Sequence, residues 1–397
     1  MTRFTAVERA LRTAAPHDFL PVLRQALATH YSVVDVELLM ADYALTILQP
    51  VTTLPYTRRP VPVHGTRPGH AFAWQQPCTE TQGTHTVVHL PVSVRGDRLG
   101  ILTVTLDPEH LDEAAQQELL DVAQVLGHEI AVGERDTDLY LQARRANRLT
   151  LAAEMQWQLL PGRTCVRPEY TIGAQLEPAY AIYGDNFDWS TTAHDLTLTV
   201  TNGMGEGIEA ALLTNLAINA LRNARRAGLS LTDQAYLADQ AVYGQHQGAQ
   251  HLSVLLLRFD LATGATEIVD AGSPRMWRLR DGRAEPVELE AQLPLGMFED
   301  THYTAEQHHT RPGDRLVFVS DGVYDVASPA GERYSERALA RALTSTRLLP
   351  ASHVPRAVLH ELTGHRGPVD AADDAMVVCL DWRGRPLAPG SGETPPA

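Results

Sequence analysis

Residues 311–322 read RPGDRLVFVSDG, an apolar run bounded by a Pro-Gly turn and an Asp-Gly turn. β-Branched and aromatic residues between such turn residues are typical of a buried strand. We therefore expect a strand over residues 315–320. Asp321 follows the last residue of that run, which predicts a carboxylate at the edge of a β-sheet.

Three more acidic or glycine-marked turns occur beside predicted strands, and they read YGDNFD (183–188), NGMGEG (202–207) and DAADD (370–374). A single Asp-Gly after a strand is ordinary turn chemistry. Carboxylates at several strand ends can, however, converge at one edge of a sheet. Such hard oxygen ligands suit Mg²⁺ or Mn²⁺ better than Zn²⁺, which prefers Cys and His. None of the 17 histidines forms an HExxH zinc motif.

The composition excludes several classes of protein. The chain has 397 residues, enough for two or three domains, and 44% of them are hydrophobic, which predicts folded domains. It contains no lysine, so neither a P-loop nor a lysine Schiff base is available, and NGMGEG is not a phosphate-binding P-loop. The net charge of −15 argues against a nucleic-acid partner, which needs a basic face.

The three cysteines, Cys78, Cys165 and Cys379, form no CxxC pair. This usage is typical of a reducing compartment. No run of about 18 apolar residues predicts a membrane span, and the first residues do not resemble a signal peptide. We expect a cytoplasmic protein with no membrane partner.

Residues 1–135 have the pattern of an α+β sensor domain. Residues 18–30 predict an amphipathic helix with Asp18 as N-cap, and residues 110–133 predict a long helix. The predicted strands between them are Val33–Met40, Ala44–Leu48, Thr86–Val94 and Leu99–Leu106. The last two read as a hairpin around Arg95-Gly96-Asp97. Pro91 places the first strand of that hairpin at a sheet edge.

Residues 136–161 predict a helical linker that ends at Pro161. An imperfect apolar seam runs along it. Two interpretations stay open. The helix either pairs with its twin as a coiled coil in a homodimer or packs on its own neighbouring domain.

Residues 162–383 mix strands with paired helices, and this pattern predicts a sandwich of sheets with helices outside. The expected strands are Tyr170–Leu176, Asp195–Thr201, Leu252–Phe259, Ala265–Asp270, Arg315–Ser320 and Ala375–Asp381. The expected helices are residues 207–226, 231–243, 333–345 and 353–363. The Pro- and Gly-rich tail, residues 384–397, is expected to be disordered.

The C-terminal part of the chain contains a series of short motifs in a fixed order. AEMQWQLLP is followed in order by GD-x-x-D, G-M-G-x-G-I-x-A-A-L, AG-x-P, PLG, RPGDRLVFVSDG and DD before the last strand. This order resembles the PPM-type (protein phosphatase 2C-like) serine/threonine phosphatases of the sporulation stage II protein E branch. The resemblance covers residues 150–382. The N-terminal element order, with G-x-L-x-V at Gly100–Val104, resembles a GAF domain.

The phosphatase resemblance implies an αββα sandwich with two divalent ions, Mn²⁺ or Mg²⁺, at one edge. A metal-activated water would then hydrolyse phosphoserine or phosphothreonine. By this resemblance Asp185, Asp321 and Asp373 are metal ligands, with Asp374 as the alternative to Asp373. Gly203 would offer its backbone carbonyl. The catalytic set would be Asp185, Asp321, Asp373 and the residue at position 202.

Position 202 departs from the family pattern, because Asn202 stands where the family has a metal-bridging Asp. An amide keeps an oxygen ligand but loses the negative charge, so one ion should bind weakly. Smaller departures are Tyr183 for Gly, Asn186 for an aromatic residue and Ser273 for His. A pseudophosphatase, which keeps the fold without turnover, is therefore the alternative hypothesis.

The resemblance also implies partners. It suggests a signalling role in sigma-factor regulation, with a phosphorylated STAS-type anti-sigma-factor antagonist as substrate and a small-molecule ligand for the GAF-like domain. Gln156, Leu159 and Leu160 lie where the linker helix enters the phosphatase domain, and we expect them to be regulatory. A third hypothesis is a plain small-molecule sensor whose output is dimerisation.

Overall fold

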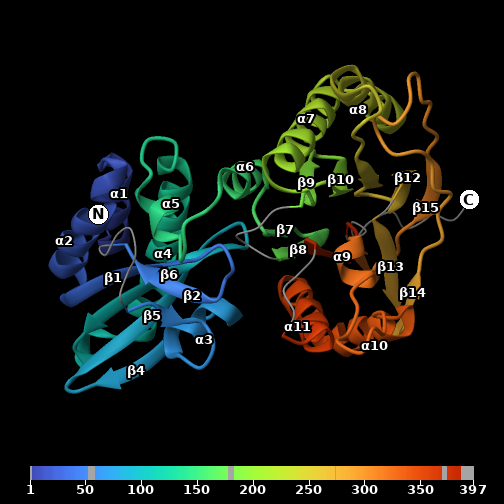
Figure 1. The fold of residues 1–397 in the computed structure, drawn as a ribbon. Coiled ribbons are helices and arrows are strands. Elements are labelled where there is room, and N and C mark those ends of the chain that lie inside the picture. Colours follow the sequence, from blue (N-terminus) through green and yellow to red (C-terminus); the bar gives the residue numbers. More distant parts are fainter. Residues whose placement is uncertain (1, 52–58, 178–182, 273, 369–372, 386–397) are drawn as a thin grey trace, which may run out of the picture. The chain divides into compact units, whose positions relative to one another are not determined.

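The chain divides into two compact units, Met1–Leu149 and Thr150–Ala397. The computed structural model describes residues 2–51, 59–177, 183–272, 274–368 and 373–385 (Figure 1). Each unit has its own buried apolar clusters, so each is described separately.

The N-terminal unit is built on one antiparallel six-stranded sheet with the order β3-β2-β1-β6-β5-β4. Its strands are β1 (Val33–Ala41), β2 (Ile47–Pro50), β3 (Val61–Pro62), β4 (Cys78–Gln82), β5 (His85–Val94) and β6 (Asp97–Leu106). Alternate residues of a strand point to opposite faces. Leu38 and Met40 therefore pack with one cluster, whereas Leu39 and Ala41 pack with another.

Helices cover both faces of this sheet. The cluster on the Leu38 face includes residues of α1 (Arg3–Thr13), α2 (Phe19–Tyr31) and α4 (Glu113–Gly133). The cluster on the Leu39 face includes Phe72 of α3 (Arg67–Trp74). The predicted mixture of helices and strands is therefore present in this unit (Figure 1).

The predicted helices and hairpin of this unit are confirmed, with two differences. Asp18 occupies the N-cap position of α2, but its side chain makes no capping hydrogen bond. β5 is not an edge strand, because it pairs with both β4 and β6. Pro91 is tolerated because β4 begins at Cys78, opposite His89, so Pro91 lies beyond the pairing with β4 and its missing N–H removes no bond to that strand. The sequence prediction missed α1, α3, β3 and β4.

The prediction of one continuous helical linker over residues 136–161 is wrong. The structure has two short helices, α5 (Leu139–Ala143) and α6 (Leu151–Leu159), separated by non-helical residues. Tyr140 is buried in the N-terminal core and its hydroxyl donates to the Pro16 carbonyl at 2.6 Å. α6 begins separately, because the Thr150 hydroxyl accepts a hydrogen bond from the Ala153 amide at 3.1 Å. The interrupted helix offers no long seam for a coiled coil.

The C-terminal unit contains two antiparallel sheets, with the orders β15-β12-β11-β10-β9 and β14-β13-β16-β17-β8-β7. One apolar cluster joins them: Leu198 and Leu257 come from the first sheet, and Phe318 and Val378 from the second. The strands are β7 (Thr164–Val166), β8 (Tyr170–Glu177), β9 (Asn186–Thr191), β10 (Asp195–Asn202), β11 (Ser253–Asp260), β12 (Ala265–Ala271), β13 (Arg275–Arg280), β14 (Arg283–Pro286), β15 (Glu306–His309), β16 (Arg315–Val319) and β17 (Ala375–Trp382).

Helices lie on the outer face of each sheet. α7 (Gly207–Arg226) and α8 (Leu231–His246) pack on the first sheet, where Ile218 and Ala235 meet Val254. α9 (Asp321–Tyr324), α10 (Glu336–Ser345) and α11 (Val354–Arg366) pack on the second. The predicted layering of helix, sheet, sheet and helix is present in this unit (Figure 1).

All six strands and four helices predicted for this unit are present, with bounds that differ by a few residues. The predicted disorder of the tail falls mainly on residues 386–397, which lie outside the described residues. Within the described ranges, no helix is both long and apolar enough to span a membrane.

Candidate metal centre

Hydrogen bonds between the Asp185 loop and the Asp374 side chain hold two loops together at one edge of the sandwich. Asp185 immediately precedes β9, and Asp374 immediately precedes β17. Asp374 Oδ2 accepts hydrogen bonds from the amides of Tyr183 (2.9 Å) and Asp185 (3.3 Å). Both carboxylates are buried, and Asp185 Oδ2 and Asp374 Oδ1 have no hydrogen-bond partner in the described part of the chain. Each therefore keeps one free oxygen inside the protein.

Asp321 and Asp373 lie beside this pair and are held by their own backbones. Asp321 Oδ1 accepts from the Gly322 amide at 2.8 Å, and Asp373 Oδ1 accepts from the Asp374 amide at 2.8 Å. The buried Ser320 hydroxyl accepts from the Met376 amide at 2.9 Å and so joins the end of β16 to β17. This junction brings the Asp321 turn and the Asp373–Asp374 turn together.

The carboxylates of this site lie close enough together to raise one another's pKa values. Burial raises the pKa of Asp185 well above its ordinary value, and the nearby Asp374, Asp321 and Asp373 carboxylates raise it further. Burial raises the pKa of Asp374 to about 7. Burial and the Asp321 charge raise the pKa of Asp373 to about 6. A bound cation would relieve this repulsion and stabilise the ionised forms.

Asn202 and Gly203 reach the same edge from the end of β10. Asn202 is the last residue of β10 and pairs with Ser253 of β11. The Gly203 amide donates to Asp185 Oδ1 at 3.2 Å. A Cβ on Gly203 would lie 2.3 Å from the carbonyl carbon of Gly184, so only glycine allows this approach. The expected metal-binding role of the Gly203 carbonyl stays a prediction.

The donors fit a hard divalent cation in their chemistry. All the side chains brought together here offer carboxylate or amide oxygen, which Mg²⁺ and Mn²⁺ prefer. The two unpaired buried oxygens of Asp185 and Asp374 are what such an ion would satisfy. Among the described residues, however, no three Asp, Glu, His or Cys side chains already meet at ligand distance.

The three residues expected to be regulatory occupy different places at the end of α6. Gln156 is buried, and its Nε2 donates to the Asp185 carbonyl at 2.5 Å. The Leu159 carbonyl accepts from Arg222 of α7 at 2.7 Å. Leu160 is partly buried against the core between the sheets. α6 is therefore bonded directly to the backbone of a candidate metal ligand.

A buried ion pair that the sequence patterns did not predict lies next to this contact. Asp188 is buried in β9 and accepts from Arg222 at 2.8 Å and Arg225 at 3.0 Å. Thr214 of α7 also donates to the Gly184 carbonyl at 2.7 Å. The sequence held a signal for this ion pair. Asp188 is the second Asp of GD-x-x-D, and Arg222 and Arg225 lie three residues apart on a predicted helix. Ser273 lies outside the described residues.

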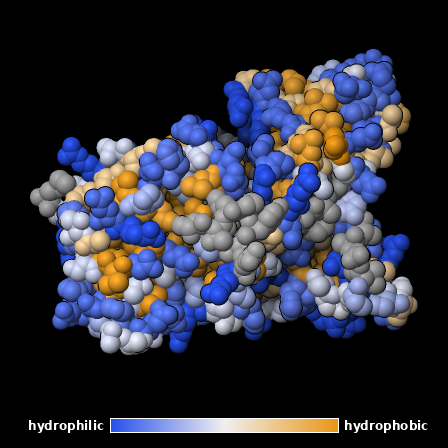
Figure 2. Space-filling view, turned by 60° about the vertical axis from the view of Figure 1, so that its left-hand side comes forward, coloured by the Kyte–Doolittle hydropathy of each residue, from blue (hydrophilic) through white to orange (hydrophobic). Residues whose placement is uncertain are grey.

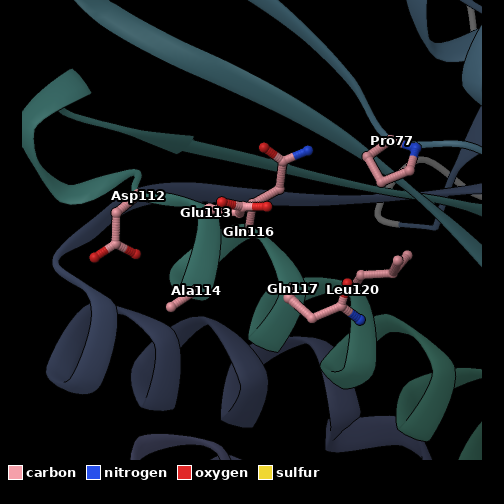
Figure 3. Close-up of a pocket in the computed structure, with 7 residues that line it drawn as sticks. All are labelled: Pro77, Asp112, Glu113, Ala114, Gln116, Gln117 and Leu120. Carbon is pink, nitrogen blue, oxygen red and sulfur yellow. The ribbon is translucent and has the colours of Figure 1, made fainter.

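The N-terminal unit has a separate open hollow of about 890 Å³ at the start of α4 (Figure 3). Pro77, Gln116, Gln117 and Leu120 are among its lining residues. Asp112, also at its rim, caps α4 by accepting from the Ala115 amide at 2.7 Å. The hollow does not identify a ligand.

Comparison with known proteins assigns the C-terminal part. Residues 192–383 match the family model of Stage II sporulation protein E (SpoIIE). This segment is therefore similar to the SpoIIE-type phosphatase domains of the PPM class. The matched segment carries Asn202, Gly203, Asp321, Asp373 and Asp374, whereas Asp185 precedes it.

Individual relatives are distant. The phosphoserine phosphatase RsbU of Bacillus subtilis is 22% identical over 208 residues, which are 52% of this chain and 62% of RsbU. The phosphoserine phosphatase RsbP of the same organism is 24% identical, over 45% of each chain. The chain thus spans about half to three fifths of these relatives. The solved SiaA-PP2C domain of Pseudomonas aeruginosa is 20% identical over 58% of this chain and 94% of that one, with a TM-score of 0.49.

Proposed function

We propose that the SpoIIE-type domain is a divalent-metal-dependent phosphatase that hydrolyses phosphoserine or phosphothreonine in a protein. The observation that carries this proposal is the pair of buried carboxylates, Asp185 and Asp374, each with an unpaired oxygen at one edge of the sandwich. The SpoIIE family match and the two phosphoserine phosphatase relatives support it.

In this proposal, some residues would bind the metal ions and others would position those ligands. Asp185, Asp321 and Asp373 or Asp374 would hold two Mn²⁺ or Mg²⁺ ions, together with Asn202 and the Gly203 carbonyl. Bound ions would supply an acidified water and offset the charge of the phosphate. Gln156 fixes the Asp185 backbone, and Gly203 keeps the two loops close.

The substrate we propose is a phosphorylated STAS-type anti-sigma-factor antagonist, by the resemblance to the SpoIIE branch. We propose further that residues 1–135 form a GAF-like sensor for a small molecule. The six-stranded antiparallel sheet of the N-terminal unit supports that reading. A signal reaching α6 could then act on Asp185 through Gln156, in a cytoplasmic protein that acts as a homodimer.

One observation favours a second candidate, a pseudophosphatase. Asn202 provides no negative charge between two ions. The retained cluster of four aspartates supports the enzyme instead, because a decayed site has no need of such mutually repelling carboxylates.

The proposal is tested by phosphate release from a phosphoserine-bearing STAS-domain protein in Mn²⁺. Wild type should release phosphate, and Asp321→Ala should not. If wild type is inactive but Asn202→Asp is active, the domain is a natural pseudophosphatase. Equal release by wild type and Asp321→Ala would contradict the assignment of the metal centre.

A further inference from the structure

An uncharged apolar strip leads away from the metal centre along α7. Met204, Ile208 and Leu212 expose 40%, 50% and 53% of their surface. Ile208 and Leu212 are one helical turn apart, so they lie on the same side of α7. Met204 follows Gly203 directly, so the strip begins at the metal centre. Hydrophobic residues gather on the part of the surface that α7 and α8 form (Figure 2).

The sequence of α7 makes this strip unusual for a surface helix. Glu209 is the only charged residue between Gly207 and Leu221. The opposite face of α7 is already buried, with Leu213 and Ala217 in a separate apolar cluster. The exposed face of α7 is thus apolar at Ile208 and Leu212 in its first two turns, whereas Asn219, Asn223 and Arg226 are exposed further along. An exposed apolar segment opposite a buried face is typical of a helix that has a second partner. Single exposed apolar residues need no explanation, but a row that begins at a reaction centre does.

Resting on the phosphatase function proposed above, we propose that Met204, Ile208 and Leu212 bind the apolar residues that flank the phosphoserine in the substrate protein. The strip is continuous with the candidate metal centre, because the Gly203 amide donates to Asp185 Oδ1 and Met204 is the next residue. A phosphoserine held at Asp185 would therefore place its neighbouring residues close to this strip. Continuity with the site therefore selects the substrate as the occupant.

The charges around the strip agree with this choice. Glu206 and Glu209 are both exposed beside it, and the metal centre is itself acidic. Acidic residues next to the phosphoserine would be repelled, whereas apolar or basic ones would be accepted. The strip would act on binding rather than on the chemical step, so it should affect KM more than kcat.

The test compares two short phosphoserine peptides that differ only in their flanks, Leu and Val in one, Ser and Gly in the other. The full-length protein is assayed in Mn²⁺ with both peptides and with p-nitrophenyl phosphate, which has no flanks. Wild type should have a KM about tenfold lower for the apolar peptide. Ile208→Ser with Leu212→Ser should lose that preference and keep its p-nitrophenyl phosphate activity.

Leu348→Ser is the matched control, because Leu348 is 85% exposed and lies at the other end of β16 from Asp321. It should keep the preference. Equal KM for both peptides in wild type, or a preference retained by the double variant, would overturn the proposal. The proposal would also be overturned if the double variant sedimented as a monomer where wild type is a dimer, and its KM for both peptides were unchanged. That result would assign the strip to contact with a second copy of the chain. If p-nitrophenyl phosphate is not hydrolysed by wild type, the phosphatase function itself fails, and this inference with it.

Discussion

Gly203 and Gly322 bring the loops of the candidate metal centre together because neither has a side chain. A Cβ on Gly203 would lie 2.3 Å from the Gly184 carbonyl carbon, and one on Gly322 would lie 1.8 Å from the Asp374 carbonyl oxygen. Both contacts are with backbone, so no side-chain rotation can relieve them. Single residues therefore decide whether the carboxylates meet.

Gly203→Ala should push the Gly184–Asp185 loop away and weaken Mn²⁺ binding at least about tenfold, because ligand geometry determines metal affinity. Titration calorimetry with Mn²⁺ measures the effect. Gly244→Ala is the matched control, since Gly244 is helical and a Cβ there meets nothing within 4 Å. Unchanged affinity in Gly203→Ala would show that the close approach is unimportant.

Asp270 gives a prediction about pH. Its side chain is buried in β12, and burial together with Glu306 raises its pKa from 3.8 to about 7. Between about pH 4 and pH 7 the folded protein then holds a proton that the unfolded chain has released. The free energy of unfolding therefore falls as pH rises through this window.

Asp270→Asn removes that titration while keeping the shape of the side chain. It should raise the free energy of unfolding by about 1–3 kcal/mol at pH 8 and by little at pH 4. Urea unfolding at the two pH values measures the difference. A variant that is more destabilised at pH 8 than at pH 4 would contradict this prediction, because it would mean that the charged Asp270 carboxylate stabilises the fold.

Sequence reasoning could find the candidate aspartates because each follows or precedes a recognisable strand. Asp321 follows RLVFVS, and Asp373 and Asp374 precede AMVVCL. It could not find Asp270, which lies within an ordinary strand. Nor could it tell that Asp374 would use one oxygen to hold the Tyr183 and Asp185 amides. Those facts depend on which loops meet in space.

At the scale of elements, α6 is the part that connects most directly to the centre. Its Gln156 side chain donates a hydrogen bond to the Asp185 carbonyl. Its last residue, Leu159, accepts a hydrogen bond from Arg222, which also donates to the Asp188 carboxylate. The sequence pointed to Gln156 through the AEMQWQLLP motif. It did not predict the break between α5 and α6, because no proline or glycine marks it between residues 139 and 160.

Gln156→Leu should keep the fold and lower Mn²⁺ affinity severalfold, because the Asp185 backbone loses its hydrogen bond. Gln158→Leu is the control, since Gln158 is exposed on the same helix and bonds only the Glu154 side chain among described residues. Mn²⁺ titration followed by thermal unfolding separates affinity from stability. Equal affinities in the two variants would remove α6 from any role at the site.

At the scale of the whole molecule, the chain is two separately packed units. Each has its own buried core, and the chain between α5 and α6 is the boundary. The sequence indicated two folded parts, since its motifs change from sensor-like strands to carboxylate-bearing turns. The boundary itself fell inside a predicted helix and so was not placed.

Residues 150–397 alone should therefore unfold in one calorimetric transition that also occurs in the full chain. Mn²⁺ should raise the temperature of that transition and EDTA should reverse the rise, because a ligand stabilises the unit that binds it. The other transition of the full chain should not move. A single transition that shifts as a whole with Mn²⁺ would contradict the division into units.

The most direct test of the central claim is Mn²⁺-dependent hydrolysis of p-nitrophenyl phosphate by wild type, Asp321→Ala and Asn202→Asp. We predict activity in wild type that is abolished in Asp321→Ala and increased in Asn202→Asp, where the added carboxylate strengthens the binding of the second ion. A silent wild type with activity gained only in Asn202→Asp would contradict the account and make the natural protein a pseudophosphatase.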